Sequence, residues 1–124
     1  MNDENNIFGD VIYAYTRQDA LNDGVFKDVS KMAKEASIVY PTAVTSNLFH
    51  KYISPTPMPS GQDEKGRLWD VLWTFKNSVK KSKSNRLTFK VLFSGKLVEL
   101  NAVCEATSPT DPSPAITIML PEDN

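Results

Sequence analysis

The chain has 124 residues, 40% hydrophobic content and a formal net charge of -1, which suits one cooperative core and is short for two ordinary domains. This near-neutral balance gives no overall attraction to nucleic acid or to an anionic membrane. Cys104 is the single cysteine, so an intramolecular disulfide is excluded and nothing indicates an oxidising compartment.

The first residues, MNDENNIF, lack a basic segment followed by an apolar run, so no signal peptide is predicted. No stretch approaches about 18 consecutive apolar residues, the length that a membrane helix needs. We therefore expect one domain, residues 1–124, in the cytoplasm, without contact to a membrane.

The N-terminal region predicts two short helices. Residues 7–15, IFGDVIYAY, fit either a short strand or a helical turn. Thr16 is suited to cap a helix over residues 17–22, with Gly24 where a helix ends in the left-handed conformation. Ser30 is a second N-cap candidate, after an extended segment and before KMAKEAS. We expect these helices to wrap the N-terminal half.

The middle of the chain predicts an extended segment, a third helix and a loop. The segment around Pro41 is extended, because a residue before proline avoids the helical region. Thr45 or Ser46 would cap NLFHKYI. The buried set of that helix would be Leu48, Phe49, Tyr52 and Ile53. Residues 54–62, SPTPMPSGQ, hold three prolines and a glycine and predict an exposed loop.

The strongest helical pattern covers residues 63–82. One stripe at helical spacing comprises Leu68, Leu72, Phe75 and Val79, flanked by Val71. Trp69 and Trp73 form an adjoining stripe, so we expect this helix to be covered on more than one side. Asp63 is suited to be its N-cap, and Gly66 favours a start at Gly66 or Arg67.

The period changes to two after this helix. Residues 87–94 alternate as a half-buried strand, Gly95 lies in a tight turn, and residues 97–105 return as a second strand. TSPTDPSP predicts a longer loop, and residues 116–120, ITIML, a third strand that ends at Pro121. The predicted fold class is α+β: short N-terminal helices and one long central helix packed on a three-stranded antiparallel meander.

Three stretches, IFGDVIYAYTRQDALNDGVFKDVS, QDEKGRLWDVLW and ITIMLPED, carry the motifs YTR, DG, DVS, GRLWD and TIMLPED. With these the chain resembles a family of small, functionally uncharacterised proteins of phages, prophages and plasmids. The resemblance covers nearly the whole chain. It implies a mobile-element setting, and with it interference with host defence or maintenance of the element, but no activity.

Arginine is scarce, with three residues against eleven lysines, and two of the three lie in these motifs. Guanidinium groups suit bidentate phosphate binding and aromatic stacking. The candidate ligand-binding residues are Tyr15, Arg17, Asp28, Arg67, Trp69 and Asp70. The alternative is structural: Arg17 and Arg67 pair with Asp23, Asp28 or Asp70 and fix the short helices to the central one.

The residue inventory favours binding over catalysis. His50 is the single histidine, so a zinc site would need carboxylates or water in support. The sequence contains no nucleophile elbow or Gly-rich phosphate loop, and Cys104 lies in a predicted strand. We predict no cofactor, no metal and no catalytic residue, although a carboxylate enzyme leaves little signature. The basic run KNSVKKSKSNR fits a solvated turn better than a nucleic-acid site.

Two functional hypotheses follow. The first is a nonenzymatic protein of a mobile element that binds a host component, sequestering a nucleotide-like ligand as counter-defence. The second is an interaction module or inhibitor that binds a host protein through charged surfaces, since residues 76–96 carry seven bases and residues 97–124 five acids. An exposed Trp73 would in addition indicate a homo-oligomer.

Overall fold

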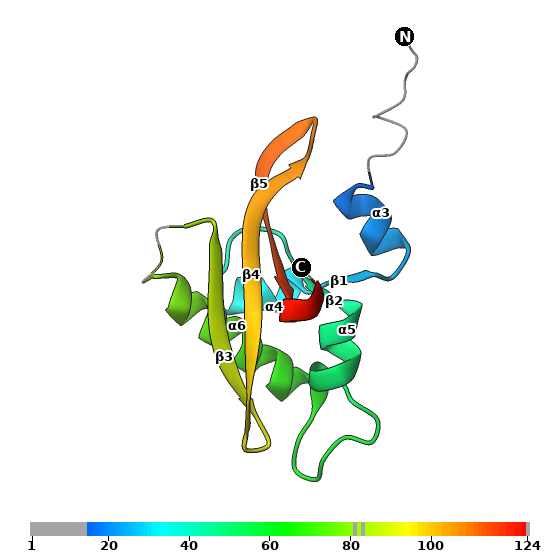
Figure 1. The fold of residues 1–124 in the computed structure, drawn as a ribbon, viewed down its shortest axis with the longest axis vertical. Coiled ribbons are helices and arrows are strands. Elements are labelled where there is room, and N and C mark those ends of the chain that lie inside the picture. Colours follow the sequence, from blue (N-terminus) through cyan, green and yellow to red (C-terminus); the bar gives the residue numbers. More distant parts are fainter. Residues whose placement is uncertain (1–14, 81, 83, 124) are drawn as a thin grey trace.

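The computed structural model describes residues 15–80, 82 and 84–123, which form an α+β fold around a five-stranded sheet (Figure 1). The strands are β1 Phe26–Asp28, β2 Thr42–Thr45, β3 Arg86–Phe93, β4 Lys96–Ser108 and β5 Asp111–Met119. The helices are α3 Arg17–Asn22, α4 Ser30–Glu35, α5 Ser46–Leu48 and α6 Glu64–Val79, with π-helical η1 Phe49–Ile53 and 3-10 helical η2 Pro121–Asp123.

The sheet corrects the predicted three-stranded meander. Its order is β1-β2-β5-β4-β3, and β2 runs parallel to β5 while the other neighbours are antiparallel. The two added strands have three and four residues, too short for alternation to be visible, and every residue of β2 is buried. A strand covered on both faces has no polar side from which its pattern could be read.

The predicted loop TSPTDPSP is mostly strand, because β4 continues to Ser108 and β5 begins at Asp111. The two strands form a long hairpin arm that projects beyond the sheet (Figure 1). The backbone N–H of Ile116 donates to the Pro41 carbonyl beside β2, so Pro114, two residues earlier in β5, lacks its N–H on that same side. β2 pairs with β5 only at residues 116–118, so this proline removes no hydrogen bond between the two strands. Pro112 lies where the register between β4 and β5 shifts.

The central helix α6 agrees with the prediction in part, because Leu68, Leu72 and Phe75 of the predicted stripe are buried, whereas Val79 at its end is 39% exposed. Asp63 is its N-cap, with the side chain accepting from the Gly66 N–H at 2.7 Å. The helix begins at Glu64 rather than at Gly66 or Arg67, because this cap already fixes the first turn. Leu72 is fully buried and Phe75 packs against Phe89 of β3.

The predicted caps hold except for Ser30. Thr16 caps α3 in a reciprocal capping box, and Gly24 has a φ of 78°. Ser30 lies inside α4; its N–H donates to Asp28, and its hydroxyl oxygen accepts from the Thr42 N–H. The predicted extended segment before it contains β1.

Thr45 caps the third helix, which starts as α5 and continues as η1. Leu48 and Ile53 are fully buried there, whereas Phe49 and Tyr52 are half-buried. Residues 54–62 form neither helix nor strand, and most of them are exposed, as predicted. The predicted strand or turn at residues 7–15 lies outside the described residues except for Tyr15, which is exposed.

The two faces of the sheet are covered differently. Ile116 and Ile118 of β5 join the core cluster formed with α4, α5, η1 and α6. Thr117 alternates with them and meets Arg17 of α3 on the opposite face. In the described part of the chain, no helix has the length and apolar character that crossing a membrane requires.

Candidate binding site

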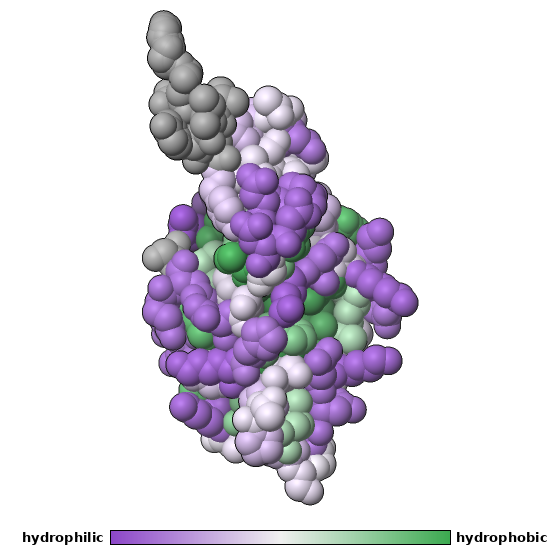
Figure 2. Space-filling view, turned by 90° about the vertical axis from the view of Figure 1, so that its right-hand side faces the viewer, coloured by the Kyte–Doolittle hydropathy of each residue, from purple (hydrophilic) through white to green (hydrophobic). Residues whose placement is uncertain are grey.

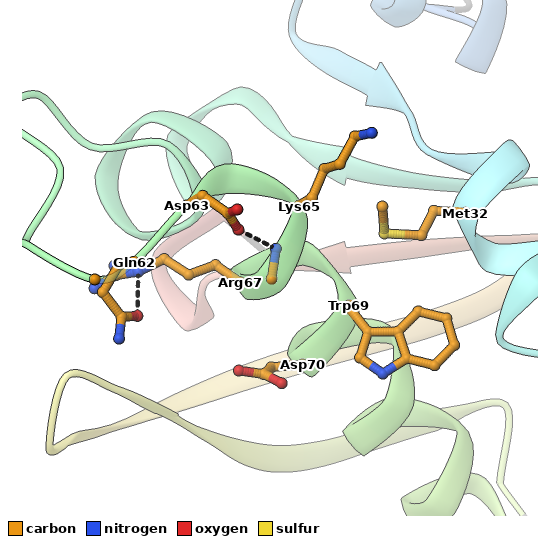
Figure 3. A pocket seen from close by; sticks show the side chains of 9 residues that line it. Met32, Gln62, Asp63, Lys65, Arg67, Trp69 and Asp70 are labelled. Atoms are coloured by element: carbon orange, nitrogen blue, oxygen red, sulfur yellow. Dashed lines mark hydrogen bonds between the residues drawn. The ribbon is translucent and has the colours of Figure 1, made fainter.

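The first turns of α6 form one wall of a cavity of about 520 Å³, which we call the tryptophan cavity (Figure 3). The side chains that line it, glycines apart, are those of Met32, Gln62, Asp63, Lys65, Arg67, Trp69 and Asp70. Arg67, Trp69 and Asp70 were candidates from the sequence. Met32 comes from α4 and Gln62 from the proline-rich loop, so tertiary packing brings three separate segments to this cavity.

Arg67 is the buried anchor of the cavity, with 5% of its surface exposed. Its guanidinium donates to the Tyr52 carbonyl at 2.7 Å and to the Ser94 hydroxyl at 2.7 Å. Its Nε donates to the Gln62 amide oxygen at 3.2 Å, and the group lies over the Phe93 ring. Arg67 thus fastens η1, the loop and the β3–β4 turn to α6.

The acceptors of Arg67 are all neutral, so an aspartate pair is not what holds it. Among the described residues, no carboxylate forms an ion pair with this guanidinium. In Figure 3 its side chain extends toward Gln62 and away from Trp69. A buried cation without a carboxylate partner favours a negative charge placed nearby.

The tryptophans correct the prediction that both lie in a covered arc. Trp69 is half-buried against the core, but Trp73 is 47% exposed. The two rings stack with centroids 5.7 Å apart, and the Lys76 ammonium lies over the Trp73 ring. The sheet and α4 cover α6 on the side of Leu68 and Leu72, which leaves Trp73 facing solvent.

The cavity therefore combines a flat ring with charges of both signs. Figure 3 shows Met32 near the indole of Trp69, where a planar group can stack. Lys65 is exposed at the rim and can pair with an anion, while the exposed Asp70 carboxylate can accept from amino or hydroxyl groups. Lys65 lies in the stretch QDEKGRLWDVLW together with Arg67, Trp69 and Asp70, whereas Met32 lies outside the motifs found in the sequence.

The other candidates, Tyr15, Arg17 and Asp28, lie elsewhere. Arg17 donates to the Thr117 hydroxyl at 2.6 Å and to the Ile116 carbonyl at 2.7 Å. Burial lowers its pKa, and the charges of Asp28 and Glu105 act in the opposite direction. These contacts hold α3 on the sheet.

Tyr15 and Arg17 line a second cavity, of about 610 Å³, between α3 and the β4–β5 arm. The Tyr15 hydroxyl donates to Asp23 at 2.8 Å, and this bond raises the pKa of the phenol. On the face of the molecule that carries α3 and α5, hydrophobic residues are exposed between hydrophilic ones (Figure 2). The structure therefore places Arg17 and Arg67 in different cavities.

The C-terminal motif has a structural role. The Asp123 carboxylate in η2 accepts from the Thr45 hydroxyl at 2.7 Å and from the Asn47 amide at 2.7 Å. It also accepts from the Leu120 N–H. One acidic side chain thus joins the end of β5 to the start of α5.

The structure offers little for metal chemistry. Among the described residues, no group of three histidine, cysteine or carboxylate side chains is placed to hold a metal ion. His50 is exposed and packs edge-on against Phe49. Cys104 is half-buried in β4, and burial together with the Glu105 charge raises the pKa of its thiol.

Cys104 should react slowly with a disulfide reagent such as DTNB. Because the thiolate is the attacking species and its pKa is raised from 9.0, we expect the native protein at pH 8 to react about tenfold more slowly than the chain unfolded in guanidinium. The reaction is followed by absorbance. Equal rates in the two states would contradict a buried, protonated thiol.

The chain was compared with known protein families, curated proteins and solved structures. Residues 4–124 match the family described as "Family of unknown function (DUF6573)". No curated protein and no solved structure matches the chain. The match extends over nearly the whole sequence, so the predicted resemblance to an uncharacterised family is confirmed.

Proposed function

The chain belongs to DUF6573, a family of unknown function, and we propose that it is a nonenzymatic binding protein that sequesters a nucleotide-like ligand in the tryptophan cavity. The resemblance to phage, prophage and plasmid proteins supports a mobile-element setting. In that setting the ligand is a component of the host cytoplasm, and its removal is a counter-defence function.

One observation carries the ligand class: the buried Arg67 cation bonds only neutral acceptors beside a cavity that is also lined by an indole. The ring of a nucleobase stacks on Trp69, with Met32 beside it. Lys65 pairs with a phosphate, whose charge is also attracted by the fixed charge of Arg67. Asp70 accepts from an amino group of the base or from a ribose hydroxyl.

This assignment changes the roles predicted from the sequence. Arg67 acts as a fixed charge and as a fastener of the cavity wall, because its donors already have protein acceptors. Tyr15 and Arg17 organise the region around α3, and Asp28 accepts from the Ser30 N–H at the start of α4. The direct contacts to the ligand come from Lys65, Trp69 and Asp70.

The two tryptophans make the proposal directly measurable, because both lie in or beside the cavity and the chain has no others. In Trp73→Phe, Trp69 is the sole reporter. Titration of this variant at about 1 µM with mononucleotides should quench its fluorescence with a Kd below about 1 mM. Lys65→Ala should raise the Kd about tenfold through loss of the phosphate pair.

Lys90→Ala, on the exposed face of β3, is the matched control and should leave the Kd unchanged. A full set of mono-, di- and cyclic nucleotides without quenching, and without a shift in melting temperature, would rule out the nucleotide class. Quenching that Lys65→Ala and Asp70→Ala leave unchanged would place the ligand elsewhere.

A second candidate function is a module that binds a host protein. The β3–β4 hairpin exposes the cross-strand pair Leu92 and Leu97, at 59% and 60%, next to the opposite charges of Lys90 and Glu99. Such a mixed apolar and charged patch suits a protein partner. A partner captured by the wild type and lost in Leu92→Lys, with affinity that falls as salt rises, would favour this function.

A further inference from the structure

The sheet ends on one side at β3, and no described strand pairs with the outer edge of β3. The strand at the opposite end, β1, has three residues, whereas β3 has eight. We propose that the β3 edge binds an extended acidic segment of a partner protein, which adds to the sheet as a further strand. This site is separate from the tryptophan cavity and does not depend on the ligand proposed there.

The outward backbone groups of β3 belong to alternate residues. Phe93 closes the two-residue turn to β4, so its N–H and C=O point toward β4. The Asn85 carbonyl, at the same parity, also accepts from a β4 N–H. The groups of Thr88, Lys90 and Leu92, at the other parity, therefore point outward, and no described residue bonds to them. Such a row of donors and acceptors is complementary to the backbone of another extended strand.

β3 lacks most of the features that protect edge strands from pairing. Its register with β4 is continuous over eight residues, and it contains no proline. The side chains that alternate toward the core, from Leu87 to Phe93, are all apolar, so no charge points inward. Lys90 stands in the middle of the solvent face. The edge is therefore regular enough to pair along its length.

The charges favour an acidic partner over a second copy. Residues 76–96 carry seven bases and no acid, and two of these bases lie in β3 itself. Pairing of two β3 strands would place basic residues of both copies together without a carboxylate. A strand with an acid opposite Lys90 gains an ion pair instead. β4 already shows this arrangement, because Glu99 lies opposite Lys90 and Leu97 opposite Leu92.

Apolar surface on both faces of the sheet lies where the added strand would contact it. On the solvent face, Leu92 and its cross-strand neighbour Leu97 are largely exposed. On the other face, Phe75 of α6 packs on Phe89, and Val79, one turn later, is partly exposed. The last turn of α6 extends past β3 on the side of its outer edge (Figure 1). A partner strand with alternating side chains would cover Leu92 with one face and Val79 with the other.

A synthetic peptide with the sequence of residues 96–103, KLVELNAV, is the probe, because these residues pair with β3 on its other side. The peptide carries an N-terminal fluorescein, and its anisotropy is measured with the full chain. We expect a Kd of about 100 µM, with weaker binding as salt rises. Glu99→Lys in the peptide should raise the Kd about fivefold, and Lys90→Glu in the protein should restore binding of this changed peptide to within about threefold.

The outward N–H groups test the binding mode separately from charge. Thr88→Pro removes one such N–H without breaking a bond to β4, so the variant should fold and bind the peptide at least about tenfold more weakly. Thr88→Val keeps the N–H and is the matched control, with a Kd within about twofold of the wild type. Thermal unfolding shows that each variant is folded. In hydrogen exchange followed by NMR, the peptide should slow exchange at Thr88, Lys90 and Leu92 but not at Val91.

Absence of peptide binding at about 1 mM would overturn the proposal. Binding that Thr88→Pro leaves unchanged, or slower exchange only at other residues, would also overturn it, because the peptide would then lie elsewhere. A dimer in sedimentation velocity that Thr88→Pro abolishes would assign the edge to a second copy instead. Peptide and nucleotide titrations report on different sites, so failure of one proposal leaves the result for the other standing.

Discussion

Replacing Arg67 with alanine is expected to lower the free energy of unfolding by about 3–4 kcal/mol. The guanidinium is buried and donates to three acceptors from three segments. Without it, the Tyr52 carbonyl loses its donor in a half-buried position, whereas the exposed Ser94 hydroxyl can bond to water instead. The side chain also packs on Phe93, so its removal leaves a cavity.

Urea denaturation followed by tryptophan fluorescence measures this loss. Arg67→Lys keeps the charge but not the planar fork, and should lose about 2 kcal/mol. Lys65→Ala is the control in the same helix turn, because its side chain is exposed, and should change stability by less than about 0.5 kcal/mol. If Arg67→Ala were as mild as this control, the arginine would be a ligand contact rather than a structural fastener.

The sequence predicted the elements whose signal is local. The Asp63 and Thr16 caps and the apolar stripe of α6 are each read within one or two helical turns. The alternation of β3 and the turn at Gly95 are equally local. These features depend on backbone periodicity and hydrogen bonding between near neighbours, so no tertiary contact is needed to see them.

The parts that were missed depend on packing between distant segments. β1 and β2 are strands because β2 adds to the free edge of β5, and nothing within three or four residues encodes that pairing. The strands of the β4–β5 arm were not predicted because of Pro112 and Pro114. Prolines are not expected in a central strand, but in the arm β5 pairs only with β4, so it is an edge strand there and tolerates them. The turn-forming residues therefore predicted a loop where the tertiary structure allows a strand.

The candidate site was predicted in part. Arg67, Trp69 and Asp70 share one cavity because they lie within a single turn of one helix. Arg17 was grouped with them because it is an arginine beside an aromatic residue in another of the motifs, but α3 lies on the opposite face of the sheet. Met32 was not predicted as a site residue. It lies in α4, far in sequence from residues 62–73, and only the packing of the core brings it to the same cavity as Trp69.

Replacing Leu72 with alanine is expected to destabilise the fold by about 3–4 kcal/mol, whereas Trp73→Ala, the next residue, should cost only about 1 kcal/mol. Leu72 is fully buried where α6 packs against the hydrophobic core, so the substitution leaves a cavity that rigid neighbours cannot fill. Trp73 is larger but 47% exposed, and its main loss is the stack with Trp69. Side-chain size and hydrophobicity alone would predict the reverse order.

Urea denaturation measures the free energy of unfolding of both variants and of the wild type. Circular dichroism follows both variants, since Trp73→Ala changes the fluorescence itself. A Trp73→Ala loss as large as that of Leu72→Ala would contradict this order and would mean that the Trp73 side chain contributes to the core, although it is 47% exposed.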